Sequence, residues 1–302
     1  MNALGTLTRV ERAVREATGS AYRITDSRAV AGGDTHRALA VSDGRTRYFV
    51  KHGGAHTREM FEAEADGLAA LAETGALRVP AVIGIGADDN GACLVLEHLD
   101  IRPLQNTEDG VRFAEALSEL HHHIGEHFGW RRDNFIGDTP QDNIPTDNWA
   151  RFVAEQRLRP QLERARENGF TGDLQRHGAR LVERLPALFL DYRPQPGLLH
   201  GDLWHGNVGM TESGQPVVFD PAVHYGDRES DLAMSELFGN FPPSFYAGYR
   251  KAWPLNDGYE TRKPLYALYH VLNHLNLFGR GYLREAERLA ARLDHELGTR
   301  SE

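Results

Sequence analysis

Cysteine is almost absent from this sequence. The single residue, Cys93, excludes an internal disulfide and a cysteine-based zinc site, and it is typical of a protein from a reducing compartment. Long apolar runs are absent too, because no stretch approaches the roughly 18 residues needed to span a bilayer. Charged residues interrupt the N-terminal segment where a secretory signal would carry its apolar core. We therefore expect a cytoplasmic protein that uses no membrane.

Basic residues are also fewer than acidic ones. The sequence has 34 Lys and Arg residues against 43 Asp and Glu residues, which gives a formal net charge of −9. Such a balance provides no general basic surface for phosphodiester backbones, so we expect no nucleic-acid partner. The hydrophobic fraction of 40% and the charged fraction of 25% are ordinary for a folded globular protein. A length of 302 residues predicts two domains or one large bilobal one.

The first third of the sequence alternates between helical and strand patterns. Thr8 and Glu11 have the spacing of a capping box, and an apolar stripe follows them as far as Gly19. Later apolar and β-branched runs predict strands separated by one further helix. The predicted strands cover 37–41, 48–51, 82–85 and 92–97, and the predicted helix covers 59–71. Together these elements indicate a small unit with an antiparallel sheet.

Beyond Leu99 the pattern becomes mainly helical. Helical apolar stripes cover residues 113–128, 149–165, 181–189, 264–278 and 283–297. Short strand patterns occur only at 198–199, 208–210 and 217–219. The sequence therefore predicts an α+β fold with a small N-terminal lobe over 1–99 and a larger, mostly helical C-terminal lobe over 100–302.

Three oxygen-bearing side chains are predicted to converge near one hairpin. Asp202 and Asn207 have the D-x-x-x-x-N spacing of a phosphotransferase catalytic loop. The strands at 208–210 and 217–219 flank a Ser-Gly turn and should pair, so Asn207 and Asp220 would lie about 5 Å apart at one end of the hairpin. Each residue alone is typical of a turn or cap. Their joint spacing instead predicts Asn207 and Asp220 as Mg²⁺ ligands and Asp202 as the acceptor of a hydroxyl proton.

A nucleotide site needs further parts, and the first third supplies candidates. The loop containing Gly32, Gly33 and Thr35 would let backbone N–H groups approach phosphates, although a Gly-Gly pair also serves any hairpin. Lys51 ends a predicted strand, where a lysine is often only a solvated edge residue. In phosphotransferases such a lysine reaches the phosphates and pairs with a helix glutamate. Glu64 is the preferred partner, while Glu62 and Glu59 remain open by spacing.

The strand over 92–97 provides a candidate for adenine recognition. It leaves the small unit as an apolar run and ends at Glu97, His98 and Leu99. Backbone N–H and C=O groups at such a strand end would face the adenine edge. We therefore include these three residues in the predicted nucleotide site.

These motifs resemble those of protein-kinase-like small-molecule kinases, and within them the fructosamine/ketosamine kinase family. The string at 200–207 is similar to the family's HGDLW-x-GN, and residues 220–234 are similar to its metal-aspartate segment. The resemblance spans nearly the whole chain, although the D-x-x-x-x-N element is shared with aminoglycoside, choline and homoserine kinases. His205 departs from the family, which more often has a small residue there. Further matching positions are 134–137, Gln141, Asn143, Trp149, Phe152, Arg157, Leu158 and 268–279.

The resemblance implies transfer of the γ-phosphoryl group of ATP, with Mg²⁺, to a sugar hydroxyl of a ketosamine, at carbon three in this family. The ketosamine is either a small molecule or bound to protein, and a monomer or weak oligomer is expected. The alternatives are a kinase for an aminoglycoside, amino alcohol or free sugar, and a catalytically silent nucleotide-binding module. The residues expected to border the acceptor are Trp204, His224, Tyr225, Asp227 and Glu229.

Overall fold

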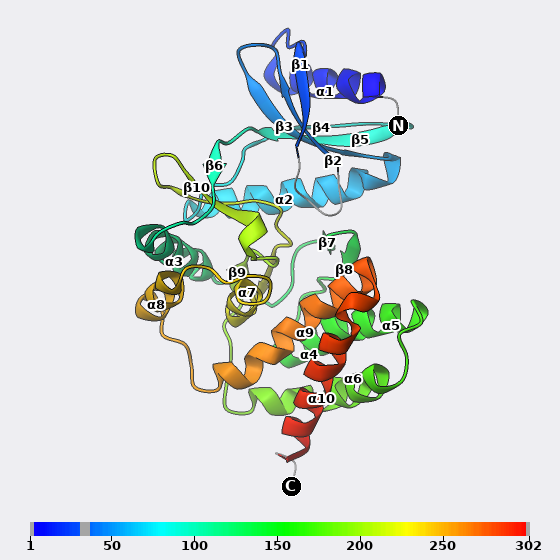
Figure 1. Ribbon diagram of the computed structural model, residues 1–302, viewed down its shortest axis with the longest axis vertical. Helices are drawn as coiled ribbons and strands as arrows, with labels where there is room; N and C mark the ends of the chain where they lie inside the picture. The colour runs from blue at the N-terminus through cyan, green and yellow to red at the C-terminus, as the bar shows by residue number, and fades with distance from the viewer. Residues whose placement is uncertain (1–2, 31–36, 300–302) are drawn as a thin grey trace. The chain divides into compact units, whose positions relative to one another are not determined.

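The computed structural model describes residues 3–30 and 37–299, and the chain forms two compact units (Figure 1). One unit comprises residues 1–104 and 206–221, and the other comprises 105–205 and 222–302. The division differs from the predicted one in two ways. The first crossing falls after Leu104 rather than Leu99, and the hairpin segment 206–221 packs with the N-terminal unit. The α+β class is confirmed, because the first unit is built on a sheet and the second is mostly helical.

A five-stranded antiparallel sheet forms the centre of the first unit, in the order β1-β2-β3-β5-β4. Four of its strands match predicted ones, whereas β1 was not predicted, because its side chains are largely exposed and show no apolar alternation. A second sheet joins three short strands in the order β11-β10-β6. The strands are β1 (Asp26–Val30), β2 (Arg37–Ser42), β3 (Arg47–Gly53), β4 (Val82–Asp88), β5 (Gly91–Glu97), β6 (Ile101–Arg102), β10 (Val208–Thr211) and β11 (Pro216–Val218).

Two helices cover this sheet and bury its apolar side chains. Helix α1 (Ala3–Thr18) packs on β4 and β5, and α2 (Arg58–Thr74) packs on the same strands. Because both faces are covered, all residues of β5 before Glu97 are buried. Helix α1 begins earlier than predicted: Thr8 lies within it and its hydroxyl donates to the Leu4 carbonyl, so the predicted capping box at Thr8 is wrong.

The second unit is a helical assembly with two small strand pairs. Strand β7 (Asn134–Ile136) pairs with β8 (Thr139–Gln141), and β9 (Gly197–Leu199) pairs with β12 (His224–Gly226). A π-helical segment, Ala154–Leu158, joins α4 to α5. The helices are α3 (Thr107–His121), α4 (Trp149–Val153), α5 (Arg159–Glu167), α6 (Asp173–Arg184), α7 (Glu229–Ser235), α8 (Pro243–Ala252), α9 (Tyr259–Phe278) and α10 (Leu283–Thr299). Among the described residues, no helix has both the length and the apolar character that crossing a membrane requires.

The predicted helix over 113–128 ends early, at His121. Beyond it the chain is extended, and Gly125 donates its backbone N–H to the Pro196 carbonyl while Ile124 forms an isolated bridge with Gly197. A Cβ atom on Gly125 would lie 2.6 Å from the Tyr225 ring, so this close approach requires glycine. The helical spacing of Ile124 and Phe128 was therefore coincidental.

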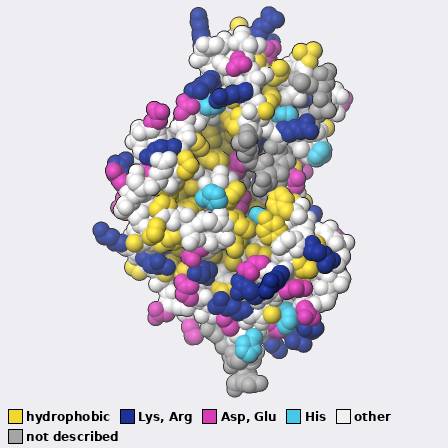
Figure 2. All heavy atoms as spheres, in the orientation of Figure 1, with side chains coloured by type: hydrophobic (Ala, Val, Ile, Leu, Met, Phe, Trp, Pro, Cys, Tyr) yellow, Lys and Arg dark blue, Asp and Glu magenta, His cyan; other side chains and the backbone are white. Residues whose placement is uncertain are grey.

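Acidic and basic side chains intermingle on the face of the molecule drawn in Figure 2. Many exposed ion pairs join residues one helical turn apart, such as Arg112 with Glu108 and Arg288 with Glu285. Pairs of this kind contribute little to stability, because water solvates the separated charges almost as well.

Asp294 on α10 is different, because it is buried against α6. Its carboxylate accepts hydrogen bonds from His177 at 2.8 Å and from Arg180 and Arg184 at 3.4 Å. We expect Asp294→Asn to lower the free energy of unfolding by about 1–3 kcal/mol, since the amide removes the buried negative charge that these three donors bind and turns its own N–H₂ group toward one of them. Denaturant unfolding measures this. Asp173→Asn, which removes an exposed pair with Arg176, should change it by less than about 0.5 kcal/mol.

The effect of Asp294→Asn on the free energy of unfolding should also depend on pH. Burial raises the pKa of Asp294, but the hydrogen bonds from His177 and Arg180 outweigh it and the net pKa is lowered. A carboxylate with a lowered pKa stabilises the fold above its ordinary value of 3.8, and this contribution is lost as the pH falls through the lower folded value. The stability difference between wild type and Asp294→Asn should therefore shrink in acid, and a difference that stayed constant would contradict this assignment.

Candidate active site

The predicted hairpin is present and brings two candidate metal ligands to the same end. Strands β10 and β11 pair antiparallel, with Val208 opposite Val218. Asn207 directly precedes β10, and its carbonyl accepts the backbone N–H of Phe219 at 3.1 Å. Asp220 follows Phe219. Asn207 and Asp220 therefore lie on neighbouring strand extensions, as the sequence predicted.

The backbone at Asp220 is in the left-handed region, with φ of 57°. It is the only non-glycine residue with a positive φ among residues 3–30 and 37–299. This conformation costs roughly 1–3 kcal/mol for such a residue and persists only where neighbouring groups fix it. Strain of this kind is concentrated at functional sites.

Lys51 on β3 joins two carboxylates. Its Nζ atom lies 2.7 Å from Glu64 Oε1 on α2 and 2.7 Å from Asp220 Oδ1. The predicted pairing of Lys51 with Glu64 is thus confirmed. The competitors are accounted for, because Glu62 pairs with Arg58 and Glu59 is exposed.

Burial and charge act in opposition at this triad. Lys51 is 8% exposed, and burial alone would lower its pKa, but Asp220 and Glu64 together raise the pKa above its usual value. Lys51 therefore stays protonated. Burial raises the pKa of Glu64 to about 7 against the lowering influence of Lys51. Buried titratable groups with shifted pKa values of this kind are concentrated at functional sites, which makes this triad a candidate.

The strand end predicted to meet adenine is only partly available. The backbone N–H of Glu97 donates to the Ala81 carbonyl at 2.8 Å. The carboxylate of Glu97 binds the Arg78 guanidinium at 2.5 Å and the Ala81 N–H at 3.1 Å. The backbone N–H of Glu97 is therefore used within the protein and is not free for adenine, whereas the role of its carbonyl stays a prediction. His98 and Leu99, both half-buried, follow the end of β5. Gly32, Gly33 and Thr35 lie outside the described residues.

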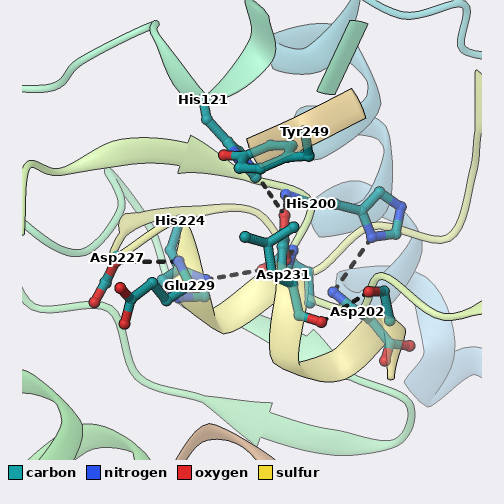
Figure 3. A network of polar contacts seen from close by, with 12 residues as sticks. His121, His200, Asp202, His224, Asp227, Glu229, Asp231 and Tyr249 are labelled. Atoms are coloured by element: carbon teal, nitrogen blue, oxygen red, sulfur yellow. Dashed lines mark hydrogen bonds and ion pairs between the residues drawn. The ribbon is translucent and has the colours of Figure 1, made fainter. Parts of the chain in front are cut away.

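A buried carboxylate fixes the backbone of the catalytic loop (Figure 3). Asp231 on α7 accepts the backbone N–H groups of His200 at 2.8 Å and Gly201 at 2.9 Å. Gly201 has a φ of 84°, and a Cβ atom there would lie 2.1 Å from the Ala222 carbonyl oxygen. Only glycine fits this position. These two hydrogen bonds fix the backbone immediately before Asp202, and they thereby fix the position of the Asp202 Cα atom.

His121 completes the donor set of Asp231. Its Nε2 atom lies 3.2 Å from Asp231 Oδ2, and its Nδ1 atom lies 2.7 Å from the Tyr249 hydroxyl (Figure 3). If Tyr249 donates to Nδ1, the imidazole proton sits on Nε2 and points to Asp231. Burial raises the pKa of Asp231, but these donors outweigh it and the net pKa is lowered, so the carboxylate stays ionised.

An acidic residue near the start of a helix is typically an N-cap, but Asp231 is not one. The residue lies within α7, which begins at Glu229, and its carboxylate turns to the catalytic loop instead of its own helix. Its partner His121, on α3, is 110 residues away in the sequence, and Tyr249 on α8, which binds His121, is 128 residues from that histidine. No local pattern in the sequence signals such a network.

Asp202 itself is half-buried beside these anchors. Its backbone N–H lies 3.3 Å from His200 Nδ1, and its charge is among the influences that raise the pKa of Tyr269 to about 12, after burial. Trp204, also half-buried, meets the ring of His205 edge-on at 4.8 Å between centroids. Asp202 and Trp204 thus both retain exposed surface, as catalysis and acceptor binding require.

The four candidate acceptor contacts after Asp220, namely His224, Tyr225, Asp227 and Glu229, are of two kinds, buried and half-buried. Tyr225 is half-buried and packs on the Trp130 ring at 5.5 Å, so part of its surface is accessible. His224 is 4% exposed and stacks on Phe152, and burial lowers its pKa to about 3. His224 is therefore a neutral, internal residue, whereas Tyr225 can contact a ligand.

Asp227 and Glu229 are fully buried, and the structure does not support their predicted contact with substrate. The carboxylate of Asp227 accepts hydrogen bonds from the hydroxyls of Tyr192 at 2.9 Å and Tyr266 at 2.6 Å. Glu229 forms two 2.7 Å hydrogen bonds with the guanidinium of Arg262. Burial raises the pKa of both carboxyls. They hold the start of α7 and thereby support Asp231.

Comparison with known proteins gives the family. The fructosamine kinase family pattern matches residues 6–296. A protein of Synechocystis named "Probable ketoamine kinase" is 44% identical over 281 residues, which cover 93% of this chain and 94% of that protein. The chain belongs to the fructosamine kinase family.

Solved structures agree with this membership and define the fold. The crystal structure of "Putative fructosamine-3-kinase" from Haemophilus somnus superposes with a TM-score of 0.88 at 31% identity, covering 95% of this chain and 97% of that one. An aminoglycoside phosphotransferase superposes with a TM-score of 0.63 at 17% identity, covering 97% and 98%. The second likeness concerns the fold alone, and it confirms the predicted bilobal, protein-kinase-like class.

Proposed function

We propose that this protein transfers the γ-phosphoryl group of ATP to a sugar hydroxyl of a ketosamine. The family membership supports the reaction class, because relatives carry the names ketoamine kinase and fructosamine-3-kinase. The observation that carries the proposal is the buried Lys51, with both Glu64 and the strained Asp220 at 2.7 Å. This arrangement serves to fix a triphosphate and a metal ion together.

Each part of the nucleotide site has a proposed role. Lys51 binds phosphate oxygens and Glu64 holds the lysine in place. Gly32, Gly33 and Thr35 are further residues proposed to bind the phosphates. The backbone of His98 and Leu99, together with the Glu97 carbonyl, faces the adenine edge.

The donors of Asn207 and Asp220 fit Mg²⁺. An amide oxygen and a carboxylate are hard ligands, and a magnesium site with two such ligands is completed by water and substrate phosphates. Asn207 is 6% exposed, whereas the side chain of Asp220 is 31% exposed, so a carboxylate oxygen can reach a ligand in solution. When bound, Mg²⁺ neutralises charge on the phosphate oxygens.

Asp202 is the proposed proton acceptor. The acceptor hydroxyl oxygen forms a bond to the γ-phosphorus, the bond from that phosphorus to the bridging oxygen of ADP breaks, and the hydroxyl proton passes to Asp202. The electron pair of the broken bond leaves with ADP. Because phosphoryl transfer needs little covalent assistance, orientation by Asp202 and electrostatic stabilisation supply most of the rate enhancement.

Trp204 and Tyr225 are the proposed contacts for the sugar. Both keep accessible aromatic surface, and flat rings stack well on the apolar faces of sugars. His224, Asp227 and Glu229 are buried, and we assign them a supporting role beneath this surface rather than contact with the sugar. The amine portion of the substrate is either a free amino acid or a protein lysine, and we propose a cytoplasmic monomer or weak oligomer.

A panel of acceptors tests the proposal. ADP formation is measured with fructoselysine, ribuloselysine, free fructose, kanamycin and choline at equal concentrations. We expect turnover with the two ketosamines and at least about tenfold lower kcat/KM with free fructose, which lacks the amine. Preferential turnover of kanamycin, choline or free sugar would instead establish one of the alternative kinases. Absence of turnover with all five, despite nucleotide binding, would indicate a silent nucleotide-binding module.

A further inference from the structure

Arg157 is a buried cation in an unusual segment. It is 3% exposed, lies in the π-helical turn between α4 and α5, and forms no ion pair with any described residue. Its guanidinium packs over the Phe152 ring at 4.4 Å. Burial lowers the pKa of Arg157 to about 10, so it stays charged at neutral pH. The carbonyls of Asp142 and Gln156 also accept hydrogen bonds from the guanidinium, and the charges of Asp142 and Asp133 act on it without pairing directly. A buried charge held in this way is still costly, and π-helical turns are frequent at functional sites, so Arg157 is a candidate functional residue.

A chain of hydrogen bonds between side-chain amides begins at Arg157, and all its bonds run in the same direction. Its Nη2 donates to Asn143 Oδ1 at 2.6 Å, and Asn143 Nδ2 donates to Asn134 Oδ1 at 2.8 Å. Asn134 Nδ2 then donates to the Val223 carbonyl at 2.8 Å. Every donor points away from the cation, so each bond polarises and strengthens the next. The three side chains are 1–4% exposed, which shields the chain from competing water.

A second branch reaches the neighbouring carbonyl. The Tyr269 hydroxyl donates to Gln141 Oε1 at 2.6 Å, and Gln141 Nε2 donates to Asn134 Oδ1 at 2.8 Å. The same Gln141 amide lies 3.5 Å from the Ala222 carbonyl, and His224 Nδ1 donates to that carbonyl at 3.1 Å. Two consecutive backbone carbonyls, those of Ala222 and Val223, are therefore fixed by side chains from distant parts of the sequence.

Ala222 is hydrogen-bonded to the loop that carries Asp202 and lies two residues after Asp220 in the sequence. Its N–H donates to the His200 carbonyl at 2.9 Å, two residues before Asp202. In the other direction, Ala222 follows the strained Asp220 with only Pro221 between them. We propose that Arg157 and its amide relay (Asn143, Asn134 and Gln141) are positioning residues that hold Ala222 and Val223, and thereby set Asp220 for Mg²⁺ and the loop that carries Asp202. This inference rests on the proposed function.

The competing explanation is that these residues only satisfy one another inside a core. The two explanations differ for Asn143→Asp. An aspartate keeps the acceptor oxygen for Arg157 and adds a counter-ion, but it turns an acceptor toward Asn134 Oδ1 and the Arg132 carbonyl. A purely structural role therefore predicts some loss of stability, with unchanged Mg²⁺ affinity and unchanged kcat in the folded protein. The relay instead loses its donor, because an ionised carboxylate has no hydrogen to give to Asn134.

The experiment compares Arg157→Met and Asn143→Asp with wild type and with Arg159→Met. Met keeps the apolar stem of Arg157 but not its charge, and Arg159 is an exposed neighbour paired with Glu155. Calorimetric titration of Mg²⁺ into the full chain saturated with AMP-PNP measures the metal affinity without any acceptor. We expect both relay variants to bind Mg²⁺ about tenfold more weakly and to lose about tenfold in kcat, as for other groups that orient metal ligands. Arg159→Met should match wild type.

The outcomes separate this inference from the proposed function. Wild-type Mg²⁺ affinity in a folded Asn143→Asp variant would overturn the positioning role, whatever the acceptor is. If Arg157→Met does not fold, Asn143→Asp decides alone, because the ion pair it gains with Arg157 offsets part of the loss of its two donor bonds. Absence of magnesium–nucleotide uptake by the wild-type protein would overturn the proposed function, and the positioning role with it. Loss of Mg²⁺ affinity in both variants, measured below the start of thermal unfolding so that the protein is folded, would establish the relay.

Discussion

Replacing Asp202 with asparagine is expected to lower kcat by about 10²- to 10⁴-fold, while the Kd for magnesium and AMP-PNP stays within about twofold of wild type. Asparagine has the same size as aspartate but no basic oxygen to take the hydroxyl proton. The loop that carries it is held by Asp231 through the backbone N–H groups of His200 and Gly201, which the substitution leaves in place. Nucleotide binding is assigned to Lys51 and Asp220 and should survive.

Steady-state kinetics with a ketosamine, combined with calorimetric nucleotide binding, measures both quantities. Asp257→Asn is the matched control, because Asp257 is an exposed carboxylate of the same unit and its replacement should leave kcat unchanged. Turnover of Asp202→Asn within about threefold of wild type would refute Asp202 as the proton acceptor. An equal loss of nucleotide affinity and turnover would instead show that Asp202 helps to bind the nucleotide.

The parts of the site that sequence alone predicted are those built from nearby residues. Asn207 and Asp220 flank one short hairpin, so antiparallel pairing was enough to bring them together. The partner of Lys51 was harder. Glu59, Glu62 and Glu64 all lie on α2, and only packing of this helix on β4 and β5 decides which one reaches the lysine.

The parts that sequence did not predict depend on distant partners. Glu229 is an ordinary acidic residue by its local pattern, and its bond with Arg262 on α9, 33 residues away, is what buries it. Asp227 is likewise buried by tyrosines from two other segments. Charged residues near a metal aspartate are reasonable candidates for substrate contacts, so only the tertiary structure distinguishes supports from contacts.

The same reasoning leads to the second large effect, at Asp231. We expect Asp231→Asn to lower kcat by about 10²-fold, because displacing a catalytic group by about 1 Å has consequences of that order. The asparagine amide would bring its N–H₂ group against one of three donors, the N–H groups of His200 and Gly201 or the imidazole of His121. At least one donor then lies buried without an acceptor, and the loop must shift.

Stability and turnover should separate in this variant. Losing hydrogen bonds to a buried carboxylate lowers the free energy of unfolding by about 1.5–3 kcal/mol, which leaves most of the protein folded at 25 °C if its total stability is typical. The control is Ser235→Ala on the same helix, where a buried hydroxyl donates to the Leu232 carbonyl at 2.7 Å and lies 3.5 Å from the Tyr246 hydroxyl. It should lose stability but keep wild-type kcat. If Asp231→Asn lost no more kcat per folded molecule than Ser235→Ala, the carboxylate would be a core residue and not the anchor of the catalytic loop.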